Sequence, residues 1–250
     1  MKQTFFITGT GTDVGKTVLT VLLAGFLRAR GVPVAALKPV CSGGRDDARK
    51  LQESLGGALT LDEINPWHFR AAIAPVLAAS RERKRVPLGP VFAHIRRLQK
   101  QFAVTLVEGA GGLLSPLGDG FDSRALLTAL KATPVIVAAN QLGVVNHLLL
   151  TLEALPPRLR SRAQVVLMAP PKPDAATASN ARLLRQLAVP RIHTLPWLGA
   201  KVSIAAALQN PAVRRALAAL TGSPENSRIP LTSPSQTQTP SDIPSRESSG

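Results

Sequence analysis

The sequence predicts an α/β protein built on a three-layer, doubly wound and mainly parallel sheet. Short apolar runs alternate with helical patterns along most of the 250 residues, as expected for successive βαβ units. A glycine-rich stretch joins the first apolar run to the first helical pattern, and a hydrophobic content of 45% is ample for one large core. No internal repeat is visible, so we expect a single domain over residues 1–222.

The predicted strands and helices follow from local patterns. Continuous apolar runs are typical of strands buried on both faces of a parallel sheet, and they cover residues 3–8, 33–37, 104–107, 134–138, 164–168 and 191–195. Helical patterns cover residues 16–30, 47–55, 88–102, 123–131, 144–155 and 175–187. Residues 223–250 are rich in Ser, Thr and Pro and poor in large apolar side chains, which predicts a disordered tail.

The chain carries 30 Lys and Arg against 15 Asp and Glu, for a net charge of +15. Such a charge makes nucleic acid a partner to consider. The basic residues are scattered, however, aromatic residues make up only 4% of the chain, and tyrosine is absent, so bases would find few stacking surfaces. A solvated basic surface is therefore favoured over a nucleic-acid groove.

Cys41 is the only cysteine, which excludes an internal disulfide and a thiolate metal site. The first predicted strand begins at residue 3, which leaves no room for a signal peptide. The most apolar window, residues 133–155, is interrupted by Pro134, Asn140 and Asn146 and is too polar for a membrane span. We expect a soluble, cytoplasmic protein with no membrane partner.

The stretch "FFITGTGTDVGKTVLTVLLAGFL" at residues 5–27 places glycines between a predicted strand and a predicted helix. A dinucleotide-binding fingerprint requires G-x-G-x-x-G, whereas Gly9, Gly11 and Gly15 give G-x-G-x-x-x-G. That fingerprint also needs an acidic residue about 20 positions further on for a ribose hydroxyl. Residues 17–45 contain no Asp or Glu, so a nicotinamide cofactor is disfavoured.

A phosphate-binding loop explains the stretch better. Gly15-Lys16-Thr17 is the closing triplet of such a loop, in which backbone N–H groups and the following helix N-terminus attract phosphate. Lys16 would reach the β- and γ-phosphates of a nucleotide, and Thr17 would ligate Mg²⁺. Thr10 stands where the strict pattern has glycine, so the loop is a variant. An ordinary strand-to-helix turn is the alternative.

Two further charged residues follow neighbouring predicted strands. Lys38 opens the segment "KPVCSGG" and Glu108 opens the segment "EGAGGLLSPLG". Ligands of open α/β sheets bind outside the carboxyl ends of strands, so Lys38 would face phosphates and Glu108 would hold Mg²⁺ directly or through water. Taken singly, a solvated lysine and a turn-capping acid are the alternatives. Together these residues predict phosphoryl transfer on a sheet of the P-loop NTPase type.

These motifs resemble the dethiobiotin synthetase family. The similarity covers "TGTGTDVGKT" (8–17), "KPVCSG" (38–43), "VEGAGGLLSPL" (107–117), "NQLGVVNHLLLT" (140–151) and "LPWL" (195–198). It implies an ATP- and Mg²⁺-dependent ligase of biotin biosynthesis that acts as a homodimer. One amine of 7,8-diaminononanoate captures CO₂ as a carbamate, which takes the γ-phosphoryl group of ATP. The other amine then closes the ring to give dethiobiotin, ADP and phosphate.

The resemblance also implies roles for individual residues. Lys16 and Lys38 are the catalytic pair. The nucleotide-binding set is Thr12, Asp13, Val14, Gly15, Lys16, Thr17, Val18, Glu108, Gly111, Gly112, Pro196, Trp197 and Leu198. The substrate-binding set is Thr12, Lys38, Ser42, Gly143, Val145 and Asn146, of which the last three act across the dimer interface. The metal set is Thr17, Asp47 and Glu108, with the adjacent Asp46 as an alternative ligand, and a helix N-cap is the alternative role for Asn146.

The chain departs from the family pattern at two notable positions. Met168 stands near where family members carry an Asn that reads adenine, so adenine recognition would fall to backbone groups near residues 196–198. Cys41 replaces a small apolar residue and is expected to be a buried, inert thiol.

Three other functions remain as alternatives. They are a cobyrinate-type amide synthetase, a partition-type ATPase and a basic nucleic-acid-binding protein. Residues 9–14 lack the additional loop lysine of partition proteins, and the chain is too short to include a glutaminase.

Overall fold

The structure is a computed structural model that describes residues 2–189, 191–199 and 202–222. The tail predicted at residues 223–250 lies outside the described residues. No helix in the described part of the chain is long and apolar enough to cross a membrane.

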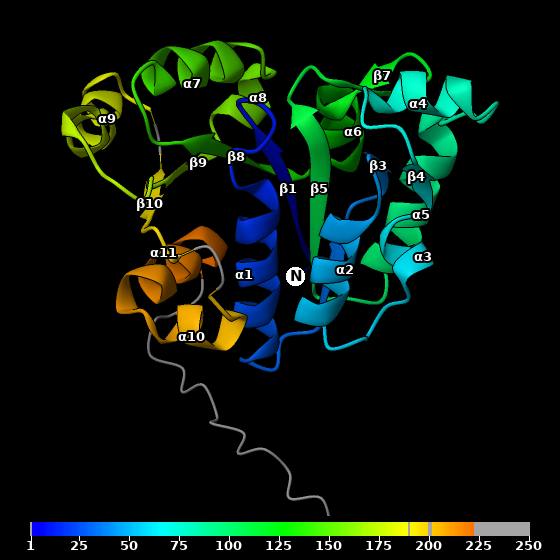
Figure 1. The fold of residues 1–250 in the computed structure, drawn as a ribbon, viewed down its shortest axis with the longest axis horizontal. Coiled ribbons are helices and arrows are strands. Elements are labelled where there is room, and N and C mark those ends of the chain that lie inside the picture. The colour runs from blue at the N-terminus through cyan, green and yellow to red at the C-terminus, as the bar shows by residue number, and fades with distance from the viewer. Residues whose placement is uncertain (1, 190, 200–201, 223–250) are drawn as a thin grey trace, which may run out of the picture.

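A 6-stranded parallel sheet forms the centre of the molecule, with the strand order β10-β9-β8-β1-β5-β2 (Figure 1). Its strands are β1 (Gln3–Gly9), β2 (Val34–Leu37), β5 (Val104–Gly112), β8 (Thr133–Ala139), β9 (Gln164–Met168) and β10 (Ile192–Leu195). Every predicted strand is therefore confirmed. The strand interiors are buried because helices cover both faces, which is why the sequence shows continuous apolar runs rather than alternation.

The connecting helices divide between the two faces of the sheet. Helix α1 (Lys16–Arg28) carries the chain from β1 toward β2. The later crossovers step the opposite way and contain α5 (Leu88–Gln99), α6 (Ser123–Leu130), α7 (Val144–Glu153) and α9 (Ala175–Gln186). Right-handed crossovers that step in opposite directions place their helices on opposite faces, as in a doubly wound sheet. The predicted fold class is thus confirmed.

Helix α1 is covered on its own side by α2 (Asp46–Ser54), α10 (Ile204–Gln209) and α11 (Pro211–Thr221) (Figure 1). Helix α2 was predicted, and the predicted helices are all present with ends that differ by three residues or fewer. The elements that the sequence analysis missed are mostly very short, which leaves no period to recognise. They are β3 (Val40–Ser42), β4 (Trp67–Phe69), β6 (Pro116–Gly118), β7 (Phe121–Asp122), α3 (Leu61–Ile64), α4 (Pro75–Arg81), α8 (Pro157–Arg160), α10 and α11.

The strand order reverses around β1, which lies between β5 and β8. This reversal opens a crevice at the carboxyl edge of the sheet, where open α/β proteins bind their ligands. In the β2–β5 pairing Leu37 lies opposite Val107, so the next residues, Lys38 and Glu108, are neighbours. The sheet register alone therefore brings a lysine and a carboxylate together in the crevice.

Candidate active site

The loop between β1 and α1 contains a left-handed backbone at Asp13 and Gly15, with φ angles of 56° and 96°. Gly15 is the N-cap of α1, and no side chain caps the helix. The first turn of α1 also contains no acidic residue, so no carboxylate of that turn competes for the unpaired backbone N–H groups at the helix N-terminus. These donors and the positive end of the helix dipole together form an anion-binding position.

Lys16 lies within this loop and is buried. Its Nζ donates to the backbone carbonyl of Gly11 at 2.7 Å. Burial lowers the pKa of Lys16 below the ordinary value for lysine, and the positive charge of Lys38 lowers it further. An anion at the loop would relieve both effects, since it would return a negative partner to a desolvated ammonium group.

Lys38 joins two carboxylates at the carboxyl edge. Its Nζ lies 2.7 Å from Oδ2 of Asp47 and 2.7 Å from Oε1 of Glu108. Burial alone would lower the pKa of Lys38, but the charges of Glu108 and Asp47 outweigh it and raise the pKa above its ordinary value. Lys38 therefore keeps its positive charge at any physiological pH.

Glu108 also accepts a hydrogen bond from Thr17, whose Oγ1 lies 2.7 Å from Oε1. The second oxygen of Glu108, Oε2, is buried and has no hydrogen-bond partner among the described residues. Burial acts to raise the pKa of Asp47, but the charge of Lys38 and their hydrogen bond lower it overall, so this carboxylate is ionised at neutral pH. The two carboxylates of Glu108 and Asp47 and the hydroxyl of Thr17 are suitable ligands for a hard divalent cation, and Oε2 of Glu108 has no other described partner.

The described residues contain no group of three or more His, Cys, Asp or Glu side chains placed to hold a metal ion. This does not conflict with Mg²⁺, because Mg²⁺ keeps several waters and is usually held by one or two carboxylates together with substrate phosphates. Thr17, Glu108 and Asp47 therefore fit a Mg²⁺ ion that accompanies a nucleotide.

A cavity of about 780 Å³ lies at the same edge, within the range of about 300–1,000 Å³ that small-molecule sites occupy. Glu108 is buried and bonded to two of the residues that line the cavity. The sequence-predicted site residues in its lining are Thr12, Asp13, Gly15, Lys16, Thr17, Val18, Lys38, Ser42, Asp47 and Gly111, together with the alternative metal ligand Asp46. Val14 and Gly112 belong to the same two loops but do not line the cavity.

The geometry distinguishes the two adjacent aspartates at the start of α2. Asp47 faces Lys38, whereas Asp46 pairs with the exposed Arg49 at 2.7 Å. The hydroxyl of Ser42 donates to the carbonyl of Ile73 at 2.5 Å, which leaves its oxygen able to accept a hydrogen bond from a ligand. As predicted, Cys41 is buried, and burial raises the pKa of its thiol.

Two predicted groups lie away from this cavity. Gly143, Val145 and Asn146 lie at the start of α7, and Asn146 lines a separate cavity of about 380 Å³. Asn146 is not the N-cap of α7, because Gly143 occupies that position with a φ of 88°. Pro196, Trp197 and Leu198 follow β10 and are absent from the lining of the 780 Å³ cavity.

Several residues in the lining were not predicted from the sequence. Lys50 lies one helical turn after Asp47, and that spacing could have indicated it. Ser115 accepts a hydrogen bond from the N–H of Gly112 at 2.8 Å and so shapes the loop after β5. Ala72, Ile73, Ala74 and Pro75 come from a segment without a recognisable motif.

Met168, at the end of β9, packs against the phosphate loop. A Cβ added to Gly15 would lie 3.0 Å from both Cγ and Cε of Met168. A thioether has no hydrogen-bond donor and is only a weak acceptor, so this side chain can pack on a base but cannot read its edge.

Three features lie together at one edge of the sheet: a strand-to-helix loop with an uncapped helix N-terminus, a buried lysine, and a carboxylate–lysine pair. They define a nucleotide-binding protein of the P-loop class. The fold agrees with this class. The structure of pNOB8 ParA bound to nonspecific DNA has a TM-score of 0.55 and 10% sequence identity, covering 89% of this chain and 99% of that chain. A family model described as an AAA domain matches residues 3–224.

Curated relatives named ATP-dependent dethiobiotin synthetase BioD narrow the class further. The protein of Anaeromyxobacter dehalogenans (strain 2CP-C) is 39% identical over 77% of this chain and 89% of its own. That of Rhodococcus erythropolis (strain PR4 / NBRC 100887) is 40% identical over 77% and 87%. That of Akkermansia muciniphila is 38% identical over 62% of this chain and 73% of its own. The chain belongs to the ATP-dependent dethiobiotin synthetase family.

Proposed function

We propose that this chain closes the ureido ring of dethiobiotin from 7,8-diaminononanoate, CO₂ and ATP. The observation that carries the proposal is the convergence of Lys16, Lys38, Thr17 and Glu108 at one edge of the sheet. Phosphoryl transfer needs little covalent help from the protein, because its rate depends mainly on positioning and on neutralising charge. The site offers both.

The reaction has three balanced steps. One amine of the diamine adds to CO₂ and loses a proton, which gives a carbamate. A carbamate oxygen attacks the γ-phosphorus of ATP, and the bond to the β-γ bridging oxygen breaks to release ADP. The second amine attacks the carbonyl carbon of the mixed anhydride and loses a proton, a C–N bond closes the ring, and the C–O bond to phosphate breaks so that phosphate leaves.

The two lysines supply positive charge near the phosphate groups in these steps. Lys38 stays protonated beside Glu108 and Asp47, so it presents a fixed positive charge at the cavity wall. The Nζ group of Lys16 donates to the loop carbonyl of Gly11, which a phosphate oxygen can replace as the acceptor. Positive groups placed where negative charge develops lower the barrier, and one such group typically contributes about 10²–10³ in rate.

Thr17, Glu108 and Asp47 would hold Mg²⁺ with the nucleotide phosphates. When bound, the ion supplies further neutralisation of the phosphate charge. Thr12 and Ser42 line the cavity beside Lys38 and would contact the substrate.

We also propose that the enzyme works as a homodimer in which Gly143, Val145 and Asn146 contact the substrate of the opposite subunit. Exposed leucines beside these residues support this arrangement, since Leu142 is 84% and Leu150 is 62% exposed. Leu149 and Leu187 are also exposed, and they line one small cavity together with Asn146 and Leu150. A second copy of the chain would cover a surface that water solvates poorly.

A coupled assay tests the function. Purified protein with 7,8-diaminononanoate, bicarbonate, Mg²⁺ and ATP should yield dethiobiotin and ADP in equal amounts, and ADP formation should depend on the diamine. Equal ADP formation with and without the diamine would contradict the proposal. The amide synthetase, partition ATPase and nucleic-acid alternatives are not favoured, because the curated relatives are dethiobiotin synthetases.

A further inference from the structure

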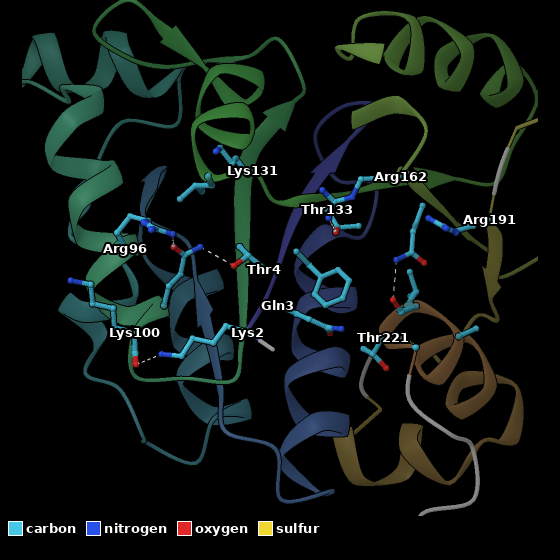
Figure 2. A pocket seen from close by; sticks show the side chains of 17 residues that line it. Lys2, Gln3, Thr4, Arg96, Lys100, Lys131, Thr133, Arg162, Arg191 and Thr221 are labelled. Carbon is cyan, nitrogen blue, oxygen red and sulfur yellow. Dashed lines mark hydrogen bonds between the residues drawn. The ribbon is translucent and has the colours of Figure 1, made fainter. Parts of the chain in front are cut away.

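A second cavity, of about 700 Å³, lies at the amino edge of the sheet (Figure 2). It is distinct from the nucleotide site, because Gln3 lines it at the start of β1 while the phosphate loop follows Gly9 at the end of that strand. Six strand residues at about 3.3 Å each separate the two positions by about 20 Å. The proposed reaction uses none of the residues in this second cavity.

The lining of this cavity is strongly basic. It contains no Asp or Glu, and its cationic residues are Lys2, Arg96, Lys100, Lys131, Arg162 and Arg191. Figure 2 shows Arg96 and Lys100 on one side of the hollow and Arg162 and Arg191 on the opposite side. We call these residues the amino-edge cluster.

The topology explains why charges distant in the sequence gather here. Lys2, Lys131, Arg162 and Arg191 each stand one or two residues before a strand of the parallel sheet. The amino ends of parallel strands share one edge, so cations in this position converge. The fold does not require a cation before each of these four strands, since polar residues of any charge serve at the start of a strand.

No member of the amino-edge cluster forms an ion pair with a described residue. Arg96 donates to Oε1 of Gln99 at 3.1 Å, and Arg162 donates to Oγ1 of Thr133 at 3.0 Å. Both acceptors are neutral, so no carboxylate among the described residues compensates these positive charges. Clefts lined by one sign of charge focus the field and attract ions of the opposite sign.

The floor of the cavity is rigidly hydrogen-bonded. Gln99 and Gln164 are buried, and their Nε2 groups donate to Oγ1 of Thr4 at 2.8 Å and to the carbonyl of Leu220 at 2.9 Å. Arg96 is tied to the same network through Gln99. These polar groups are therefore held in place before a ligand binds, while the six cationic side chains above them are exposed.

We propose that this cavity binds a small anion carrying two or more phosphate groups, as a site separate from the ATP-binding loop. Guanidinium and ammonium groups are the usual partners of phosphate, and Arg binds it in two-pronged fashion. Six cations around one hollow match a ligand with several negative charges better than a single orthophosphate. A volume of about 700 Å³ suits a molecule of nucleotide or polyphosphate size.

Nucleic acid fits the same surface less well. A nucleic-acid groove tracks an extended backbone and offers aromatic side chains for stacking. Here the charges ring a hollow, and the only aromatic residue in the lining, Phe5, is buried. A compact polyphosphate is therefore the occupant that the lining favours.

Calorimetric titration of the full chain tests the site, with inorganic tripolyphosphate and orthophosphate as probes. One equivalent of Mg²⁺ and of the non-hydrolysable analogue AMPPNP per protein chain is present, so that the phosphate loop is occupied while no excess nucleotide competes with the probe. The variant Arg96→Gln/Arg162→Gln removes one cation from each side of the cavity. The matched control, Arg81→Gln/Arg83→Gln, removes two exposed charges near the end of α4 that form no ion pair with a described residue.

Tripolyphosphate should bind the wild-type chain and the control variant alike, and the cavity variant about tenfold or more weakly. Orthophosphate should bind more weakly than tripolyphosphate. Absence of binding to the wild type, or equal weakening in both double variants, would overturn the proposal, because the attraction would then come from the overall charge. Duplex DNA that binds through Arg96 and Arg162 while tripolyphosphate does not would overturn it too.

Discussion

Lys38 and Glu108 form a buried ion pair with Nζ and Oε1 2.7 Å apart and side chains that are 7% and 0% exposed. The pair arises from the register of two neighbouring strands, in which Leu37 lies opposite Val107. Thr17 and Asp47 connect the pair to the phosphate loop and to α2. The Lys38–Glu108 contact therefore follows from the sheet register and links the residues proposed to bind phosphate and Mg²⁺.

Breaking this pair should destabilise the protein strongly. Glu108→Ala leaves Lys38 buried with Asp47 alone, and removal of one partner from a buried pair typically costs about 3–5 kcal/mol. Asp47→Asn should cost only about 1 kcal/mol, because the Asp47 side chain is 41% exposed. Urea unfolding of both variants measures the difference. Equal losses in the two variants would show that burial of Glu108 does not matter.

The two lysines should differ in what they contribute. Lys16→Met should lower the rate of dethiobiotin formation by about a hundredfold or more, without loss of stability, since it removes a desolvated charge that has no carboxylate within bonding distance. Lys38→Met should lower both rate and stability, because Glu108 then stays buried and unpaired. Initial rates and melting temperatures of the two variants test this contrast. A Lys16→Met variant with near-normal turnover would refute the catalytic role.

The phosphate loop should not tolerate a side chain at Gly15. Its φ of 96° is left-handed, and an added Cβ would press on Met168 at 3.0 Å. Gly15→Ala should therefore lower the free energy of unfolding by about 1–2 kcal/mol or more. Gly11→Ala is the matched control for stability, because nothing lies within 4 Å of its added Cβ. Similar melting temperatures for the two variants would contradict this explanation.

The apolar surface on α7 should mediate self-association. Leu150→Asp places a charge on that surface and should shift the protein from dimer to monomer. Leu77→Asp is the matched control, because Leu77 is 57% exposed on α4, away from α7. Sedimentation velocity distinguishes the species. A wild-type monomer at concentrations where the enzyme is active, or a Leu150→Asp dimer, would refute the arrangement.

His193 should make stability depend on pH. Burial, and then the charge of Arg191, lower its pKa below the ordinary value of 6.5. The unfolded chain therefore takes up the proton first, so the contribution of His193 to stability is constant above about pH 7 and falls as the pH drops below about 6.5.

His193→Gln should flatten this decline, whose slope cannot exceed about 1.4 kcal/mol per pH unit and is reduced by the partial exposure of the ring. Urea unfolding at several pH values measures it. His147→Gln, at an exposed position of α7, is the control and should leave the decline in place. An unchanged decline in the His193 variant would assign the effect to another group.

The sequence predicts the main sheet and helices because apolar runs and helical periods are long enough to recognise. The meeting of Lys16, Lys38 and Glu108 is also predictable, since parallel strands share their carboxyl edge. The choice between Asp46 and Asp47 is not, because neighbouring helical residues point about 100° apart and only packing decides which one faces inward. The amino-edge cluster needs the strand order before its members can be placed together.

The central claim is that Lys16, Lys38, Thr17 and Glu108 act on one triphosphate. A crystal structure of the chain with Mg²⁺ and AMPPNP tests it most directly. The claim predicts that both lysine Nζ atoms contact phosphate oxygens and that the ion lies beside Thr17 and the free oxygen of Glu108. A nucleotide bound elsewhere, with Lys16 still bonded to the carbonyl of Gly11, would contradict it.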